Sequence, residues 1–204
     1  MLDKTIRTFT EESASKAPVP GGGGVSALCG SLAASLAEMV TNLTTGKKKY
    51  AEYEKEIQGI MKRTETLRTS LLECIEKDAE AFAPLAAAYS MDKNAEDYEQ
   101  RMEACLRSAA EPPYEIMKYC AEVIRLDERL AVIGSKLAVS DAGTSAMLAH
   151  GALCGAYLNV RVNTRLMKDR EYAEILDEKA DVLLAEYSER ALNCFNAVVE
   201  RMDG

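Results

Sequence analysis

Apolar residues recur at intervals of three and four along most of the chain, which is the spacing of an amphipathic α-helix. A stripe of this kind runs from Tyr172 to Val198. Between residues 51 and 89 the apolar positions are Ile57, Ile60, Leu67, Leu71, Ile75, Phe82 and Leu85. Because no alternation with a period of two extends over any length of the chain, the pattern predicts an all-α fold.

Long helices are predicted at about residues 25–44, 51–89, 140–164 and 170–202. A further helix begins near Asn94, is interrupted by Pro112 and Pro113, and resumes through Ile124. The interruption is expected because proline has no backbone N–H and its ring clashes with the preceding turn. For the same reason we expect Pro84 to kink or end the helix that contains it.

Two of the predicted helices, at 25–44 and 140–164, are rich in alanine, glycine and serine and are apolar almost all round. Such helices belong at the centre of a bundle, where small side chains let backbones approach closely. The other three have charged outer faces and are expected to wrap around this pair. Residues 1–204 then form one helical domain, and dimerisation would cover any apolar face left exposed.

Composition agrees with a folded domain, because 48% of the residues are hydrophobic and 28% are charged. The net charge of −8 argues against a general nucleic-acid-binding protein. An anionic partner would have to meet a local cluster of basic residues. Lys47, Lys48 and Lys49 form such a cluster.

Cysteine usage indicates a reducing, cytoplasmic environment. The six cysteines lack the spacing of a metal or redox motif and lie at Cys29, Cys74, Cys105, Cys120, Cys154 and Cys194. We expect buried free thiols, and the opening residues MLDKTIRTFTEE lack the pattern of a signal peptide. Segment 25–43 is long enough to span a membrane, but Glu38 and Asn42 interrupt it, so we interpret it as a buried helix without membrane contact.

Asp78 places a carboxylate inside an apolar stripe. Steps of three and four along the helix bring it onto the same face as Ile75 and Phe82. Burying a neutral polar group without a hydrogen-bond partner costs about 2–7 kcal/mol, and burying an unpaired carboxylate costs at least several kcal/mol. Burial also raises the pKa of the carboxylate. Asp78 therefore either forms a structural ion pair or helix-cap contact, or it has a catalytic or ligand-binding role.

Polar residues also follow one face of the second small-residue helix, at Asp141, Asn159 and Asn163. Asp141 and Asn159 would be about 27 Å apart along an unbroken helix, so both cannot contact one reacting atom within a single chain. Helix capping explains these polar residues equally well, because Ser140 or Asp141 could be the N-cap and the asparagines could lie in a C-terminal turn. The sole histidine, His150, has no partner at nucleophile or metal-ligand spacing, so no metal site is expected.

The run Gly21–Gly24 leads directly into a helix. Glycines permit a close approach to the backbone, and the free N–H groups of a helix N-terminus favour an anion or a polarised carbonyl. The run is not a P-loop, because no Lys-Ser or Lys-Thr pair follows it and no strand precedes it. The lysines at 47–49 follow Gly46, so they either complement the helix dipole or form an anion site.

Five blocks of sequence, taken together, are specific: PVPGGGGVSAL at 18–28, NLTTGKKKY at 42–50, DAEAF at 78–82, SDAG at 140–143 and GAYLNVRVN at 155–163. In this order they resemble the cyclodeaminase/cyclohydrolase family of folate enzymes. One departure is Ser135, where the family often has asparagine after the glycine. The resemblance implies an all-helical homodimer that acts on tetrahydrofolate carrying a one-carbon unit, without a metal, nicotinamide or flavin.

The resemblance also implies roles for residues in these blocks. The candidate substrate-binding residues are Gly22, Gly23, Gly24, Ser26, Lys47, Lys48, Asn159 and Asn163. Of these, the lysines would bind the anionic glutamate tail of the folate, including a polyglutamylated one. The candidate catalytic residues are Asp78, Asp141 and Lys49. An ionised Asp78 would stabilise a cationic amidinium and then act as a base, while Lys49 would orient water.

The predicted function is that of a methenyltetrahydrofolate cyclohydrolase, which opens 5,10-methenyltetrahydrofolate with water. The 204 residues contain no formiminotransferase segment, which favours this choice over the first alternative, a formiminotetrahydrofolate cyclodeaminase that releases ammonia. The second alternative is a helical dimer that binds folate without turnover.

Overall fold

The computed structural model describes residues 1–203, and within that range it contains α-helices, two 3₁₀-helices at Lys48–Tyr53 and Lys136–Ala138, and no strand. The α-helices are α1 (Ile6–Ser13), α2 (Gly22–Asn42), α3 (Glu54–Ala88), α4 (Tyr98–Ile133), α5 (Val139–Thr164) and α6 (Arg170–Asp203). The predicted all-α fold is confirmed.

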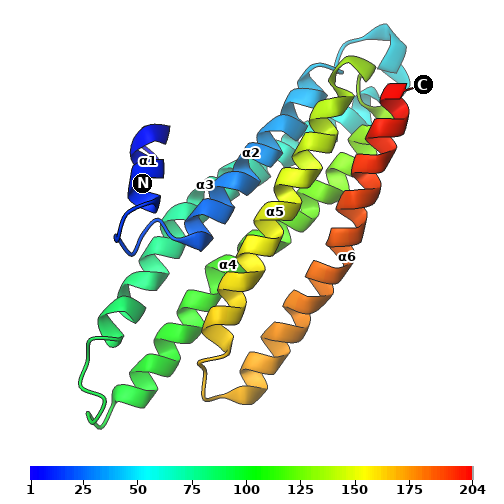
Figure 1. The fold of residues 1–204 in the computed structure, drawn as a ribbon. Helices are drawn as coiled ribbons and strands as arrows, with labels where there is room; N and C mark the ends of the chain where they lie inside the picture. Colours follow the sequence, from blue (N-terminus) through cyan, green and yellow to red (C-terminus); the bar gives the residue numbers. More distant parts are fainter. Residues whose placement is uncertain (204) are drawn as a thin grey trace.

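The long helices form an up-and-down bundle (Figure 1). Helices α3, α4, α5 and α6 run along it in alternating directions, and α4 contacts α2, α3, α5 and α6. Helix α2 is shorter and begins part-way along the bundle, beside α5, while α1 lies outside next to α2 (Figure 1). The N-terminus of α2 therefore points into the space between α3, α4 and α5.

Helices α2 and α5 run antiparallel, so the two ends of α2 have chemically different surroundings. At one end, an added Cβ on Gly22 would lie 2.8 Å from Asn159 Nδ2. At the other end, the Ser135 backbone N–H donates a hydrogen bond of 2.8 Å to the Thr44 hydroxyl. The start of α2 thus lies near the end of α5, and the residues after α2 lie near the start of α5.

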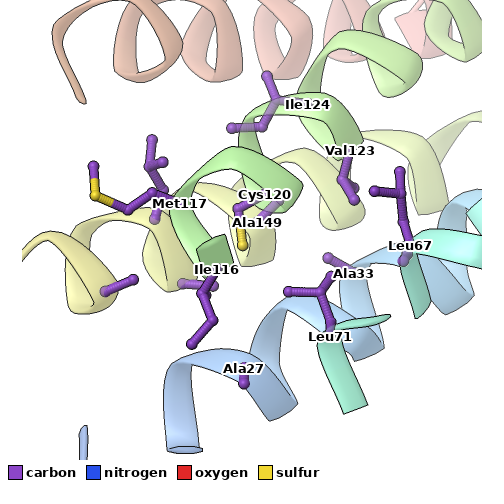
Figure 2. Close-up of a cluster of buried hydrophobic side chains, with 14 of the residues drawn as sticks. Ala27, Ala33, Leu67, Leu71, Ile116, Met117, Cys120, Val123, Ile124 and Ala149 are labelled. Atoms are coloured by element: carbon purple, nitrogen blue, oxygen red, sulfur yellow. The ribbon is translucent and has the colours of Figure 1, made fainter. Parts of the chain in front are cut away.

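The core combines small residues of α2 and α5 with large residues of α3 and α4. Figure 2 shows Ala27 and Ala33 of α2 facing Leu71 of α3, with Ile116 and Cys120 of α4 beside them. All of these side chains are fully buried. Small side chains on one helix let the backbone of its neighbour approach closely, and the larger residues fill the remaining space.

Several predicted boundaries are wrong. Helix α2 begins at Gly22 rather than near residue 25, so the glycines form its first turn instead of a loop. The N-cap of α5 is Ala138 rather than Ser140 or Asp141, because a 3₁₀ turn runs directly into the helix. Asp141 consequently lies within the first turn of α5.

The predicted interruption at Pro112 and Pro113 is also wrong, because α4 continues through both. Proline at 113 cannot donate to the carbonyl of Ala109, four residues earlier. Asn163 of α5 replaces that donor, since its Nδ2 lies 3.1 Å from the Ala109 oxygen. Helix α3 likewise does not end at Pro84 but continues to Ala88.

Helices α2 and α5 pack against each other, as predicted for the small-residue pair, but each leaves one face exposed. Among the described helices, α2 alone is long and apolar enough to cross a bilayer, with a mean hydropathy of 1.4. The mean hydropathy refers to an 18-residue stretch of α2, and 56% of that stretch is buried inside the protein. Core helices are also apolar and mostly buried.

The six cysteines are free thiols. Cys74, Cys120 and Cys194 are buried, as predicted, whereas the other three are half-buried. Burial raises the pKa of Cys74 to about 11 and that of Cys194 to about 12. These two thiols are therefore protonated near neutral pH and unreactive as nucleophiles.

Asp127 of α4 is a fully buried acid that joins three helices. Ser145 Oγ lies 2.7 Å from the Ala33 carbonyl oxygen and 2.7 Å from Asp127 Oδ2. One hydroxyl proton serves only one acceptor, so both bonds form at once when Asp127 carries a proton and donates to Ser145. Burial raises the pKa of Asp127 well above its usual range, and its Oδ1 has no hydrogen-bond partner among residues 1–203.

We predict that Asp127→Asn stabilises the protein at pH 7 to 8. The native state keeps the Asp127 proton and the unfolded state loses it near pH 4. The free energy of unfolding of the wild type therefore falls with rising pH, by up to about 1.4 kcal/mol per unit, until the native pKa is reached. An asparagine amide donates the same hydrogen bond without titrating. Thermal unfolding from pH 4.5 to 8 should show the variant gaining most at high pH.

Glu200 is an exposed acid on α6, and Glu200→Gln is the matched control. The stability of this variant should change with pH in the same way as that of the wild type. An Asp127→Asn variant whose stability tracks the wild type at every pH would contradict the assignment of a neutral Asp127.

Candidate functional site

A cavity of about 220 Å³ lies beneath the N-terminus of α2. Its polar side chains are Asp78 from α3 with Asn159 and Asn163 from α5. The remaining wall is made of backbone and apolar groups from Pro18, Val19, Gly21, Gly22, Gly23, Phe82, Ala109, Pro113 and Val162. Residues from four separate parts of the sequence therefore meet at one point of the bundle.

Asp78 lies directly against the first turn of α2. A Cβ on Gly23 would be 2.0 Å from Asp78 Oδ1 and 2.5 Å from its Cγ, so only glycine permits this approach. Helix α2 has no side-chain N-cap of its own, and the Gly24 backbone N–H interacts with the Asp78 carboxylate. Asp78 thus supplies the negative group that the positive end of α2 favours.

Two opposing effects set the pKa of Asp78. Burial raises the pKa, and the interaction with the Gly24 N–H lowers it by a smaller amount, so that the pKa lies above the usual range of an aspartate. Within residues 1–203 Asp78 forms no ion pair. Of the two structural interpretations, the helix-cap contact describes Asp78 and the ion pair does not.

The two asparagines differ in how many donors they have left. Asn163 Nδ2 donates to the backbone oxygens of Ala109 and Asn159, at 3.1 and 2.9 Å, which uses both of its N–H groups. Asn159 Nδ2 donates one hydrogen bond of 2.8 Å to the Gly155 oxygen. Asn159 therefore keeps one N–H and its carbonyl oxygen for a ligand, whereas Asn163 offers only its carbonyl oxygen.

Two predicted substrate-binding residues lie just outside this cavity. The Ser26 hydroxyl donates a hydrogen bond of 2.7 Å to the Gly22 oxygen and faces an adjoining groove between α2 and α5. Gly24 does not line the cavity, and a Cβ added to it would lie 3.5 Å from Pro20 and 3.8 Å from Ile75. Both residues shape the first turn of α2 without lining the cavity itself.

Asp78 lies at the start of α2, and the residues at the other end of that helix are Lys47, Lys48, Lys49 and Asp141. Lys47 Nζ donates a hydrogen bond of 3.1 Å to Ser135, beside the start of α5 (Figure 1). Because a helix of 21 residues is about 30 Å long, the length of α2 separates this end from the cavity. Within one chain the structure unites Asp78, the glycines and the asparagines, but not the lysines.

The arrangement suits proton transfer to or from a flat polar ligand. The cavity offers a half-buried carboxylate, free amide groups and the N–H groups of a helix N-terminus between apolar walls. A carboxylate in such a site can stabilise a cation and accept a proton from water. No group of three or more His, Cys, Asp or Glu side chains in residues 1–203 is placed to hold a metal ion.

Comparison with known proteins gives consistent matches over most of the chain. The family model described as formiminotransferase-cyclodeaminase matches residues 5–182. A methenyltetrahydrofolate cyclohydrolase from Methylorubrum extorquens is 39% identical over 188 residues, which cover 90% of each chain. The formimidoyltransferase-cyclodeaminase of Rattus norvegicus is 27% identical over 94% of this chain, but this chain spans only 36% of that protein.

The fold also matches a solved structure. The crystal structure of formiminotetrahydrofolate cyclodeaminase from Thermotoga maritima superposes with a TM-score of 0.84 at 28% sequence identity. The match covers 100% of this chain and 98% of the other, so the complete bundle is shared.

We predict that Gly23→Ala lowers the free energy of unfolding by about 1–3 kcal/mol, because its Cβ overlaps the Asp78 carboxylate. Urea unfolding measures the loss. In an Asp78→Ala background the same substitution should cost much less, since the overlapping atoms are gone. Gly59→Ala on α3 is the control, because its Cβ would have no neighbour within 4 Å, and it should stabilise the helix by about 1 kcal/mol. Equal losses in both backgrounds would contradict the contact.

Proposed function

Because the chain belongs to the formiminotransferase-cyclodeaminase family of folate one-carbon enzymes, we propose that it is a cyclohydrolase that converts 5,10-methenyltetrahydrofolate to 10-formyltetrahydrofolate. The similarity to the Methylorubrum cyclohydrolase carries the choice of reaction. That relative is 39% identical and is matched over 90% of its length, whereas the rat and mouse cyclodeaminases are 27% and 28% identical and extend far beyond this chain.

The cavity suits this chemistry. The methenyl carbon belongs to a cationic amidinium, which an ionised Asp78 stabilises in a site with apolar walls. Water adds to that carbon while Asp78 accepts a proton, giving a neutral hydroxyl adduct. The bond from the carbon to N5 then breaks as Asp78 returns its proton to N5. The hydroxyl proton is lost to solvent, and the formyl group remains on N10.

The amides and glycines orient the substrate. The free N–H and carbonyl oxygen of Asn159 form a donor and acceptor pair that matches the edge of a pterin ring. The glycine backbone at Gly21–Gly23 permits close approach of a ring that a Cβ would block. Phe82 and Val162 provide apolar surface for the faces of the ring.

The test is a mixed assay on purified protein. Loss of the methenyl absorbance is compared with buffer alone, and release of ammonia from 5-formiminotetrahydrofolate is measured in parallel. Faster hydrolysis than deamination is the expected result. Faster ammonia release would replace the proposal with a cyclodeaminase, and binding without acceleration of either reaction would replace it with a folate-binding protein.

We predict that Asp78→Asn keeps the fold but lowers kcat by about 10²- to 10⁴-fold, the range for loss of general acid–base catalysis. The amide retains the shape of the carboxylate but neither carries charge nor accepts a proton. Glu73→Gln, an exposed acid on the same helix, is the control and should leave kcat unchanged. A large drop in melting temperature with near-normal kcat would instead identify Asp78 as purely structural.

We also predict an acidic limb in the pH profile of kcat. The reaction needs the ionised carboxylate, and burial raises the pKa of Asp78. Activity should therefore fall as pH decreases through a pKa above the usual aspartate range. The residual activity of Asp78→Asn should lack this limb. An identical limb in the variant would assign it to another group.

A further inference from the structure

Two asparagine side chains of α5 line the Asp78 cavity one helical turn apart. They are Asn159 and Asn163, and among the lining residues of the described chain Asp78 is the only titratable one. Residues spaced by four on a helix lie on the same face, about 6 Å apart along the axis. A ring that enters the cavity therefore meets two neutral amides from α5 and a single acid from α3.

The Asn163 amide is held so that only its oxygen is left for a ligand. Its Nδ2 donates to the backbone oxygens of Ala109 and Asn159, at 3.1 and 2.9 Å. Asn163 is only 8% exposed. Within residues 1–203 the sealed side-chain atoms without a partner are Thr45 Oγ1 and Asp127 Oδ1, so the unpaired Oδ1 of Asn163 stays open to the cavity. A nearly buried acceptor of this kind is costly to leave without a donor.

Asn159 supplies the other two groups of this wall. Its Nδ2 donates one hydrogen bond, to the Gly155 oxygen at 2.8 Å, which leaves one N–H and Oδ1 for a ligand. The amide lies against the first turn of α2, because a Cβ on Gly22 would be 2.8 Å from Asn159 Nδ2. The α5 wall thus offers one donor and one acceptor from Asn159 and a second acceptor from Asn163.

We propose that the α5 wall reads the pyrimidine edge of the substrate ring and that Asn163 specifies its 2-amino group. A 2-amino-4-oxo pyrimidine presents one acceptor, O4, followed by two donors, N3–H and the 2-amino group. The Asn159 amide pairs with O4 and N3–H, and Asn163 Oδ1 accepts from the 2-amino group. The inference rests on the proposed function, because it takes the bound ring to be that of a tetrahydrofolate.

The position of Asp78 agrees with this orientation. Asp78 lies against Gly23 and Asn159 lies against Gly22, so the carboxylate is beside the Asn159 end of the wall. In a pterin, O4 and N5 are on the same side of the ring system, and the 2-amino group is at the far end of the edge. Pairing O4 with Asn159 therefore turns N5, which carries the methenyl carbon, toward Asp78.

The alternative orientation is unfavourable. A ring turned over, with its 2-amino group at Asn159, would set O4 against Asn163 Oδ1, so that two acceptors would face each other. A 2,4-dioxo ring would meet the same conflict in either orientation, because it has an oxygen at both ends of the edge. The wall therefore selects a pterin over a lumazine by leaving the wrong ring with an unpaired buried acceptor.

Binding of two stable ligands tests the readout without turnover. Folic acid carries the 2-amino group, whereas 2-desamino-2-methylfolic acid has a methyl group there and is otherwise identical. The wild type should bind the methyl analogue about 10- to 100-fold more weakly, because the Asn163 oxygen loses its donor. Isothermal titration calorimetry gives both dissociation constants. Equal affinities of the wild type for the two ligands would overturn the proposal.

Two variants assign the preference to a residue. Asn163→Ala should bind the two ligands with nearly equal affinity. Asn159→Ala, one turn away on the same wall, is the matched control: it should weaken both ligands by a similar factor and keep the preference. A purely structural Asn163 would affect both ligands alike, so a preference that survives Asn163→Ala would overturn its role. Melting temperatures show whether the variants are folded, and the wild-type comparison decides if Asn163→Ala is not.

The outcome is separable from that of the activity assay. A wild type that prefers folic acid but does not accelerate methenyl hydrolysis would reject the cyclohydrolase and leave the edge readout standing. Hydrolysis by a wild type that shows no preference would reject the readout and leave the cyclohydrolase standing.

Discussion

The contact between the Asp78 carboxylate and the first turn of α2 determines the geometry of the whole site. Because a Cβ on Gly23 would overlap the carboxylate, the contact fixes both the residue type and the level at which α2 begins. That level lies part-way along the bundle, so the start of α2 closes one end of a space bounded by α3, α4 and α5 (Figure 1). The glycines therefore form an ordered first turn of α2 rather than a flexible loop. Because they have no side chains, this turn leaves room for the Asp78 carboxylate and for a planar ligand.

The bundle holds one fully buried acid, Asp127, and one half-buried acid, Asp78, in different ways. Asp127 is sealed among α2, α4 and α5, where its proton completes a hydrogen-bonded chain through Ser145 to Ala33. Asp78 instead opens into a cavity and meets the N–H groups of a helix end, which favour its charge. One environment keeps a carboxyl group neutral and structural, and the other raises the pKa of a carboxyl group that still opens into a cavity, as general acid–base chemistry often requires.

Periodicity predicted the all-α fold and identified Asp78, because a carboxylate in an apolar stripe stands out without any structure. The same step would have found Asp127, which falls between Val123 and Leu130 on the buried side of α4. Three-dimensional contacts decided the rest. The prolines of α4 predicted a break in that helix, which does not occur because Asn163 of α5 donates the missing hydrogen bond to Ala109. No local sequence pattern reveals a contact between two separate helices. The separation of the lysines from the glycines could be read from the predicted helix at 25–44, which lies between them, but the sequence did not show that Asp78 of another helix would lie at the glycine end.

The hydrogen bond from Asn163 to the Ala109 carbonyl has a consequence for the evolution of this chain. The carbonyl needs an outside donor only because Pro113 lacks an N–H. With an ordinary residue at 113 the helix would satisfy that carbonyl itself, and the asparagine would be free to change or to turn its amide toward the cavity. We therefore expect the two positions to be coupled, so that losing the proline would give the Asp78 cavity a second adjustable polar group.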